Sequence, residues 1–296
     1  MNMRECFVQT TKELIRADNK VGLVLAGISV AGFADEIKDF PERIFDAGIS
    51  EQANVSIAAG MSLTGMIPVF HSFAPFISER AYEQLKIDFG YQNIGGNFIT
   101  TGASLDCSCF GATHQCPAEI GILKEIPNFQ IIVPGTAEEF RQLYLETYNN
   151  GSPTYIRTSR EQNTLSYPVK FGKANVIKTG SELTIIAVGN ILQMVIDAVS
   201  DLDVTILYYT TIQPFDAETL KGNIANNNKV LLCEPYYKGA LLYDIVESVN
   251  GKLQIDMVGI PHEFCKHYGL TTECYEYMGL TKTEIRRKAI KMIEDR

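Results

Sequence analysis

The sequence predicts an α/β protein made of two doubly wound domains. Short apolar runs such as Val21–Ala26 and Leu183–Val188 are typical of buried parallel strands. Helical patterns follow such runs in alternation, which favours parallel sheets covered by helices. A polar connection with Pro168 and Gly172 separates two series of this kind. We therefore expect a first domain over residues 1–165, a linker over 166–178 and a second domain over 179–296.

The expected elements follow from apolar spacing and from the turn residues between them. In the first domain we expect strands at 21–26, 43–45, 67–70, 97–101, 129–133 and 154–157, and helices at 4–16, 51–63, 78–89, 118–125 and 137–148. In the second we expect strands at 183–188, 204–209, 229–233 and 253–258, and helices at 191–200, 239–249, 281–294 and from 217 on.

Composition excludes several classes of function. The chain has 296 residues, of which 46% are hydrophobic and 21% charged, and a formal net charge of −9. No run of basic residues stands out before Arg286–Lys288, so nucleic acid and anionic membranes are not expected as partners. The start is not a secretory signal, and no apolar run reaches the ~18 residues that span a bilayer. Seven cysteines without a framework spacing predict reduced thiols and a cytoplasmic protein.

The segment from Phe45 to Gly65 organises the chain. A strand end is followed by a turn and then by a helix rich in small residues. Ser50 is expected to cap that helix with its hydroxyl. Glu51 then lies on the first turn, either facing water at the positive end of the helix dipole or buried beside a specific partner. Periodicity alone leaves both interpretations open. The small residues Ala58–Gly60 are expected to face another subunit.

Six motifs in order carry a resemblance to a known family. The chain resembles the transketolase family, in particular the C-terminal half as it occurs in split, two-subunit members. The motifs are GISEQ (Gly48–Gln52), SFAPFISERAYEQ (Ser72–Gln84), GATHQ (Gly111–Gln115), IPNFQIIVPGTAEE (Ile126–Glu139), YIRTSR (Tyr155–Arg160) and, in the second domain, TIQPFDAETL (Thr211–Leu220).

The resemblance implies a pyrimidine-binding domain followed by a transketolase C-terminal-like domain, in a thiamine diphosphate enzyme that transfers a two-carbon ketol unit between sugar carbonyl compounds. In that family the diphosphate and its magnesium are held by an N-terminal domain with a GDG motif, and this sequence contains no GDG. The resemblance therefore implies a separate N-terminal subunit that ligates the magnesium, in an assembly of two plus two chains. The substrate would be a small sugar molecule.

The resemblance also assigns residues to the cofactor. Glu51 matches the glutamate that hydrogen-bonds the aminopyrimidine ring nitrogen, which favours the tautomer that deprotonates the thiazolium carbon. This role is best served in a dry site where no cation competes for the carboxylate. Ile49 matches the residue that supports the bent cofactor. Phe73 and Phe76 match the aromatic lining of the pyrimidine ring, although two core aromatics at this spacing remain an alternative.

Three further residues match substrate-binding positions of the family. His114 is expected to contact substrate oxygens, whereas a histidine before a helix is otherwise often only a hydrogen-bonded residue. Arg160, and Arg4 on a shorter match, are expected to bind a sugar phosphate. Arg80 is interpreted as structural, held by a salt bridge.

The chain departs from the family at three positions. Phe110 stands where the family has an acid that recognises a donor hydroxyl, Gly102 where it has a loop histidine, and Gly27 where it has an early aspartate. An aromatic ring cannot replace a carboxylate's hydrogen bond, so we expect a non-standard donor. Asp106 is expected to substitute in part if the loop folds inward.

Two alternatives remain open for the function. One is an acyloin-forming, deoxyxylulose-phosphate-synthase-like carboligase that decarboxylates a 2-oxo acid, which the missing acid at Phe110 favours. The other is a non-catalytic assembly subunit, which the presence of Glu51 disfavours.

Four soft ligands lie within ten residues and raise the question of a metal site. They are Cys107, Cys109, His114 and Cys116. Their spacing is not a standard one for zinc or an iron–sulfur cluster. We expect reduced thiols here and no metal.

Overall fold

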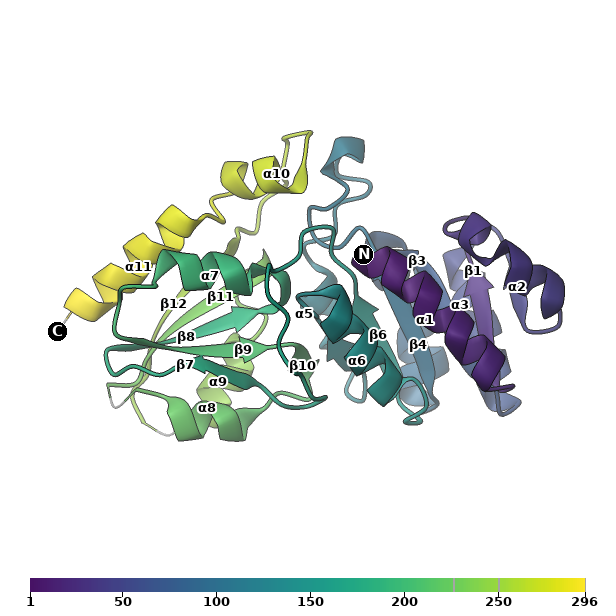
Figure 1. Ribbon diagram of the computed structural model, residues 1–296, viewed down its shortest axis with the longest axis horizontal. Coiled ribbons are helices and arrows are strands. Elements are labelled where there is room, and N and C mark those ends of the chain that lie inside the picture. The colour runs from purple at the N-terminus through teal and green to yellow at the C-terminus, as the bar shows by residue number, and fades with distance from the viewer. Residues whose placement is uncertain (226, 250, 296) are drawn as a thin grey trace.

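The computed structural model describes residues 1–225, 227–249 and 251–295, and the chain forms two sheets side by side in an elongated molecule (Figure 1). The seven-stranded sheet has the order β10-β5-β6-β4-β3-β1-β2, and β1 to β6 run parallel. Its strands are β1 (Val21–Leu25), β2 (Ile44–Asp46), β3 (Ile67–Phe73), β4 (Gly96–Thr101), β5 (Gln130–Ile132), β6 (Pro153–Arg157) and β10 (Thr211–Gln213).

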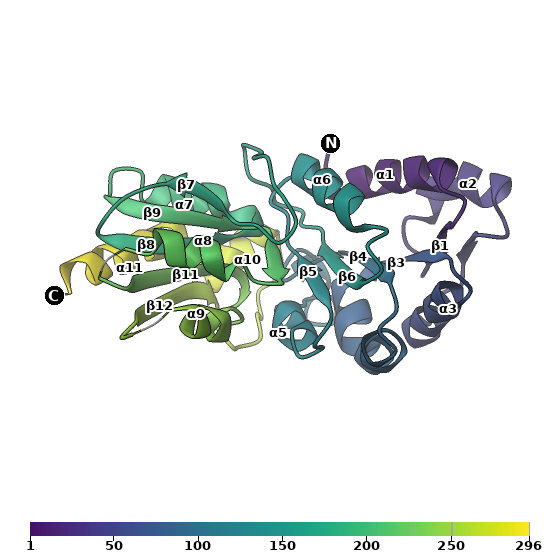
Figure 2. The ribbon, with the colours of Figure 1, turned by 90° about the horizontal axis from the view of Figure 1, so that it is seen from below.

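Helices cover both faces of this sheet (Figure 2). One face carries α1 (Met3–Ala17), α2 (Ala34–Asp39) and α6 (Ala137–Thr147). The other carries α3 (Glu51–Leu63) and α5 (Glu119–Leu123). The expected helix at 78–89 is instead a broken segment, in which π-helical turns at Phe76–Arg80 and Leu85–Tyr91 flank the short α4 (Tyr82–Gln84).

The second sheet has five strands in the order β12-β11-β8-β9-β7. They are β7 (Asn175–Lys178), β8 (Leu183–Val188), β9 (Val204–Tyr209), β11 (Lys229–Tyr237) and β12 (Gln254–Ile260), and only the edge strand β7 runs antiparallel. Its helices are α7 (Leu192–Ala198), α8 (Ala217–Asn223), α9 (Leu242–Ser248), α10 (Thr271–Tyr277) and α11 (Lys282–Glu294). The last four residues of the expected linker thus form a strand.

One strand crosses between the two sheets. β10 follows β9 in the chain, yet it pairs antiparallel with β5 of the seven-stranded sheet, Thr211 opposite Ile132. The backbone N–H of Val133 also donates to the carbonyl of Thr210 (2.7 Å). Sequence reasoning missed β10 because three residues are too few for a periodic signal.

The apolar layers are continuous across both sheets. One cluster joins α1 and α6 to α7 and α11, with members from Met3 to Met292. The other joins α3 and α5 to α8 and α9, with members from Val24 to Ile245. Ala58 and Ala59 belong to this second cluster and are buried within the chain itself. The expectation that they face another subunit is therefore wrong, and of the three residues only Gly60 is exposed.

A buried ion pair lies where the two sheets meet. Arg157, at the end of β6, and Glu119, at the start of α5, have no exposed surface, and Arg157 Nε donates to Glu119 Oε1 (2.9 Å). The guanidinium also donates to Asn190 Oδ1 of the second domain (3.3 Å). Tyr155 donates its hydroxyl hydrogen to the other oxygen of Glu119. The pair thus connects both domains through a single guanidinium.

Replacing Arg157 by methionine is expected to lower the free energy of unfolding by about 3–5 kcal/mol, because Glu119 would be left as a buried charge without its cation. Urea denaturation measures the change. The double variant Arg157→Met/Glu119→Gln is the control and should recover most of the loss. A single variant within about 1 kcal/mol of the parent would contradict the assigned role of the pair.

Candidate active site

The candidate site lies at the carboxyl ends of β1, β3 and β4, the edge where open parallel sheets place their ligands. The turn between β2 and α3 is fixed by Asp46, whose Oδ1 accepts from the backbone N–H of Gly27 (2.8 Å) and of Gly48 (3.2 Å). Gly48 has a φ of +76°, a conformation that favours glycine. This turn delivers Glu51 to the first turn of α3.

Glu51 is buried, with 1% of its surface exposed, so the interpretation of a water-facing carboxylate is wrong. Its Oε2 accepts from Arg80 Nη1 (2.7 Å), and its Oε1 accepts from Ser72 Oγ at the longer distance of 3.4 Å. Ser50 stands at the N-cap but makes no side-chain capping bond, contrary to the prediction. The carboxylate is thus held firmly at one oxygen and loosely at the other.

Arg80 forms the salt bridge expected of it, and its partner is the candidate catalytic carboxylate itself. The guanidinium also lies over the ring of Phe76, 4.0 Å from its centroid. Its side chain is 41% exposed, so it reaches Glu51 from the surface. A cation therefore does compete for Glu51 in this chain, whereas the cofactor role is best served without one.

Three of the predicted residues come together as an aromatic cluster. The ring of His114 lies 5.4 Å from that of Phe73 and 5.2 Å from that of Phe76, both edge to face. Phe110 joins them, with its centroid 5.0 Å from the imidazole. It is 61% exposed, so an aromatic face borders His114 where the family has a carboxylate. Ile49 is 74% exposed on the turn before α3.

The loop that carries His114 is packed closely around the glycine at position 102. A Cβ added at Gly102, where φ is +72°, would lie 2.8 Å from Cys107 Sγ and 2.9 Å from a ring carbon of Phe73. No histidine fits there without displacing both neighbours. The glycine at this position is thus matched to the cysteine and the aromatic ring that pack against it.

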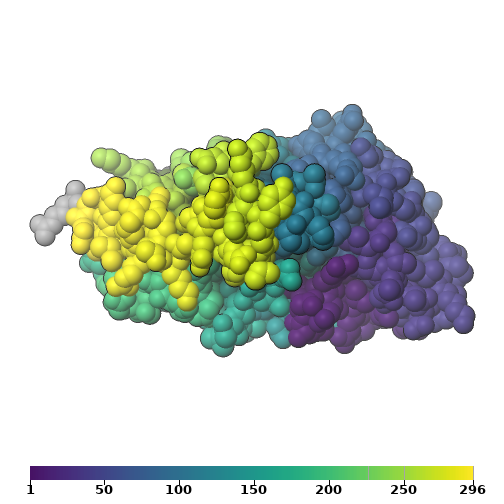
Figure 3. All heavy atoms as spheres, turned by 90° about the horizontal axis from the view of Figure 1, so that it is seen from above, coloured from purple at the N-terminus to yellow at the C-terminus, as the bar shows by residue number. Residues whose placement is uncertain are grey.

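Asp106 does not take the place of the missing acid. It is 4% exposed; its Oδ2 accepts from the backbone N–H of Arg160 (2.7 Å), and its Oδ1 accepts from Thr271 Oγ1 in α10 (3.4 Å). Burial raises its pKa to about 7. Figure 3 shows the C-terminal segment (yellow) lying against this part of the first domain. The aspartate therefore fastens the loop to α10 and to the backbone of Arg160.

The two candidate arginines approach the same loop. Burial raises the pKa of the Cys107 thiol to about 11, and the charges of Arg160 and Arg4 both oppose that rise. Both arginines are solvent-exposed. Arg4 donates from Nε to Ser29 Oγ (3.0 Å). Both arginines thus act on the thiol of this loop, and their binding of a sugar phosphate stays a prediction.

The four soft ligands do not converge. Cys116 is buried against Ser78 and Glu79, whereas Cys109 is exposed. Across the part of the chain that the structure describes, no group of three or more His, Cys, Asp or Glu side chains could hold a metal ion. Nor is any helix of these residues long and apolar enough to cross a membrane.

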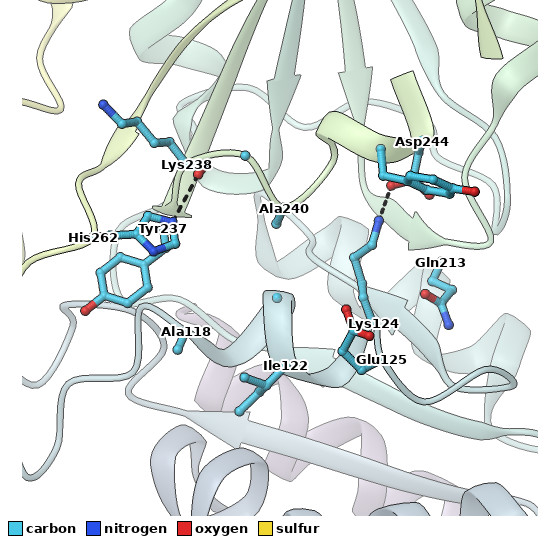
Figure 4. A pocket seen from close by; sticks show the side chains of 13 residues that line it. Ala118, Ile122, Lys124, Glu125, Gln213, Tyr237, Lys238, Ala240, Asp244 and His262 are labelled. Atoms are coloured by element: carbon cyan, nitrogen blue, oxygen red, sulfur yellow. Dashed lines mark hydrogen bonds and ion pairs between the residues drawn. The ribbon is translucent and has the colours of Figure 1, made fainter. Parts of the chain in front are cut away.

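A cavity of about 870 Å³ lies apart from these residues, between α5 and α9 (Figure 4). Tyr237 and His262 stack on one side of it (4.7 Å between ring centroids), and the ion pair of Lys124 and Asp244 closes the other. None of the predicted site residues lines it.

Comparison with known proteins agrees with this architecture. Residues 1–164 match the model of the transketolase pyrimidine-binding domain, and residues 172–285 match that of the transketolase C-terminal domain. The fold and its buried carboxylate thus define a transketolase-type α/β protein. The chain belongs to the transketolase family, of which it holds these two domains.

Relatives of similar length are known. An uncharacterized 33.6 kDa protein of the fasciation locus of Rhodococcoides fascians is 34% identical, over 90% of this chain and 87% of its own length. An apulose-4-phosphate transketolase subunit of Actinobacillus succinogenes is 28% identical, over 87% of this chain and 86% of its own length. The 1-deoxy-D-xylulose-5-phosphate synthase of Halothermothrix orenii is 29% identical over 99% of this chain, which spans only 48% of that enzyme.

A solved structure confirms the fold. It is titled a split gene transketolase, inactive beta4 tetramer, and it superimposes with a TM-score of 0.86 over 99% of this chain and 98% of its own. At 24% identity, this likeness establishes the fold alone.

The buried histidine behind Arg4 gives a pH prediction. Burial lowers the pKa of His71 to about 3, against about 6.5 in the unfolded chain. Below pH 6.5 the unfolded state therefore binds a proton that the folded state does not, and the free energy of unfolding falls. We expect this group to cost about 2 kcal/mol between pH 7 and pH 5.

The measurement is urea denaturation at both pH values for the parent and for His71→Phe, in which the loss should be smaller by that amount. The same change at the partly exposed His267 serves as the control. An equal pH dependence in the parent and in His71→Phe would contradict the assigned burial of the ring.

Proposed function

We propose that this chain is the C-terminal subunit of a split, thiamine diphosphate-dependent transketolase-like enzyme, which transfers a two-carbon ketol unit between sugar or sugar phosphate carbonyl compounds. The observation that carries the proposal is the buried Glu51, whose partner Arg80 lies over Phe76 in the cluster of Phe73, Phe76 and His114, within the two matching family domains. The relative from Actinobacillus succinogenes, which is named as one subunit of a transketolase and is similar over most of both chains, supports the split arrangement.

The residues of this chain fit one end of the cofactor. Among the described residues, Glu51 Oε1 has only the 3.4 Å contact with Ser72, so it retains lone pairs for a further donor. The half-buried rings of Phe73 and Phe76 offer an apolar wall to a flat heteroaromatic ring. When bound, thiamine diphosphate would supply the carbanion that carries the two-carbon unit. Glu51 would hold the proton at the pyrimidine nitrogen, and Ile49 would support the cofactor from the turn.

The diphosphate end of the cofactor would be bound by the partner subunit. We assign the diphosphate and its magnesium to a separate N-terminal subunit, in an assembly of two plus two chains.

The seven cysteines are all unpaired, which fits a protein of the reducing cytoplasm.

His114 and the two arginines would bind the sugar. The imidazole would contact substrate oxygens, and Arg4 and Arg160 would hold a phosphate at the far end. Phe110 stands in place of the acid that recognises a donor hydroxyl in the family. Asp106 cannot replace that acid, because its carboxylate binds the backbone of Arg160. The donor is therefore one that lacks that hydroxyl or presents it differently.

The aromatic surface at Phe110 also favours a second function. A carboligase that decarboxylates a 2-oxo acid such as pyruvate needs no acid at residue 110, and a deoxyxylulose-phosphate synthase is among the relatives. A third function is that of a non-catalytic assembly subunit. The burial of Glu51 disfavours this function.

Thiamine diphosphate binding should require both subunits. Calorimetry with magnesium is expected to detect binding to the mixture of this chain and its N-terminal partner, and none to this chain alone. Glu51→Gln should still bind but lose at least about a hundredfold in turnover. Glu138→Gln, at an exposed glutamate in the first turn of α6, is the matched control. Tight binding by this chain alone would contradict the split arrangement, and an inert Glu51→Gln would favour the assembly subunit.

Phe110 should govern the choice of donor. In the assembled enzyme, Phe110→Asp is expected to raise kcat/KM for a ketose phosphate donor about tenfold or more, since it restores a charged hydrogen bond to the donor. Phe110→Leu removes the ring without adding an acid and should not do so. Carbon dioxide release from pyruvate by the parent, with no gain for Phe110→Asp, would instead favour the carboligase.

A further inference from the structure

A chain of hydrogen bonds runs from the interior of the sheet to Arg4. Arg4 Nε donates to Ser29 Oγ (3.0 Å), Ser29 Oγ lies 3.0 Å from His71 Nε2, and His71 Nδ1 lies 2.7 Å from the carbonyl oxygen of Ile99. The four residues come from α1, the turn after β1, β3 and β4. They are up to 95 positions apart in the sequence, so only the fold brings them together.

The direction of each hydrogen bond follows from the innermost acceptor of the chain, the carbonyl oxygen of Ile99. A carbonyl oxygen can only accept, so His71 carries its proton on Nδ1 and presents a lone pair at Nε2. Ser29 must then give its hydroxyl hydrogen to Nε2, which leaves the oxygen's lone pairs directed toward Arg4. The serine cannot reverse its role while the imidazole stays neutral.

The imidazole is kept neutral by its surroundings. His71 has no exposed surface, its ring lies 4.2 Å from that of Phe7, and its pKa is about 3. The guanidinium of Arg4 disfavours a second positive charge and lowers the pKa of His71 further. The tautomer is therefore constant over the pH range in which proteins normally work.

Ser29 occupies an unusual backbone conformation. Its φ is +59°, in the left-handed region that residues other than glycine rarely adopt. It follows Gly27, on the turn that Asp46 ties to the start of α3. Glycine would adopt this conformation without strain, so the serine at this position points to a use for its hydroxyl.

We propose that Ser29 and His71 are positioning residues for Arg4, which they orient to bind the phosphate group of a sugar phosphate. Ser29 takes up Nε, so both Nη groups remain for two parallel bonds to an anion; among the described residues, Arg4 makes no other side-chain hydrogen bond. Arg160 is tied to the same loop through its backbone N–H, which donates to Asp106 Oδ2 (2.7 Å). The inference rests on the proposed function in that Arg4 contacts the substrate.

The test uses the assembled enzyme with Ser29→Gly, which removes the hydroxyl and suits the left-handed backbone, and with Arg4→Met. We expect Ser29→Gly to raise KM for a phosphorylated acceptor sugar about tenfold, since a hydrogen bond to a charged group is lost. The turnover number and KM for the unphosphorylated form of the same sugar should stay within twofold. Asn93→Gly, at another left-handed position (φ +52°) remote from the site, is the matched control.

A second measurement does not depend on activity. Binding of inorganic phosphate to the same assembly, followed by calorimetry, should weaken about tenfold in Ser29→Gly and at least as much in Arg4→Met. Nitrogen NMR of the full chain should show His71 as the Nδ1–H tautomer.

The outcomes separate the inference from the function on which it rests. Weaker phosphate binding in an assembly without ketol transfer would support the positioning role and refute the proposed reaction. Unchanged phosphate affinity and KM in Ser29→Gly, with a loss in Arg4→Met, would overturn the role of Ser29. An equal rise of KM for both sugar forms would overturn it as well, because that is the effect of a merely structural residue. No effect in Arg4→Met would overturn the anion site itself.

Discussion

The buried pair of Arg157 and Glu119 is the interaction on which the arrangement of the two sheets depends. Glu119 accepts from Arg157, from Tyr155 and from the backbone of Ser104, which begins the loop toward His114. Arg157 also reaches Asn190 and, at 3.5 Å, the carbonyl of Pro235 in the second domain. A charge pair without water is stable only when its remaining lone pairs and protons are bonded. The substrate loop and the domain junction are therefore built around the same two charges.

The second domain contributes to the site without supplying a cofactor residue. Thr271 of α10 holds Asp106, and the ring of Tyr268 lies so close to Gly111 that a Cβ there would come within 2.6 Å of it. The backbone of Arg160 is fixed through the same aspartate. The loop that carries His114 is thus pressed between the strand ends of the first domain and the C-terminal segment. Its aromatic and apolar residues suit that packing better than a run of acids would.

The sequence predicted the parts of this structure that local pattern encodes. Buried strands such as β1 and β8 are continuous apolar runs, and the family motifs located Glu51, Phe73, Phe76 and His114. What could not be predicted depends on contacts between distant segments. Arg157 looks like a surface residue until Glu119 is brought to it, and Ser29 and His71 carry no motif at all. The ion pair of Glu51 and Arg80 was missed in a different way. The sequence predicted a salt bridge for Arg80 but did not identify its partner.

The crossover of β10 has a consequence for how the chain folds during synthesis. β5 leaves an unpaired backbone edge until Thr211–Gln213 arrive from the second domain, after β8 and β9 have been made. An open strand edge is a template for pairing with other chains. The first domain therefore emerges from the ribosome with one edge unprotected for some fifty residues after β6. The two family domains form one folding unit, and a cut between them would expose the edge that β10 covers.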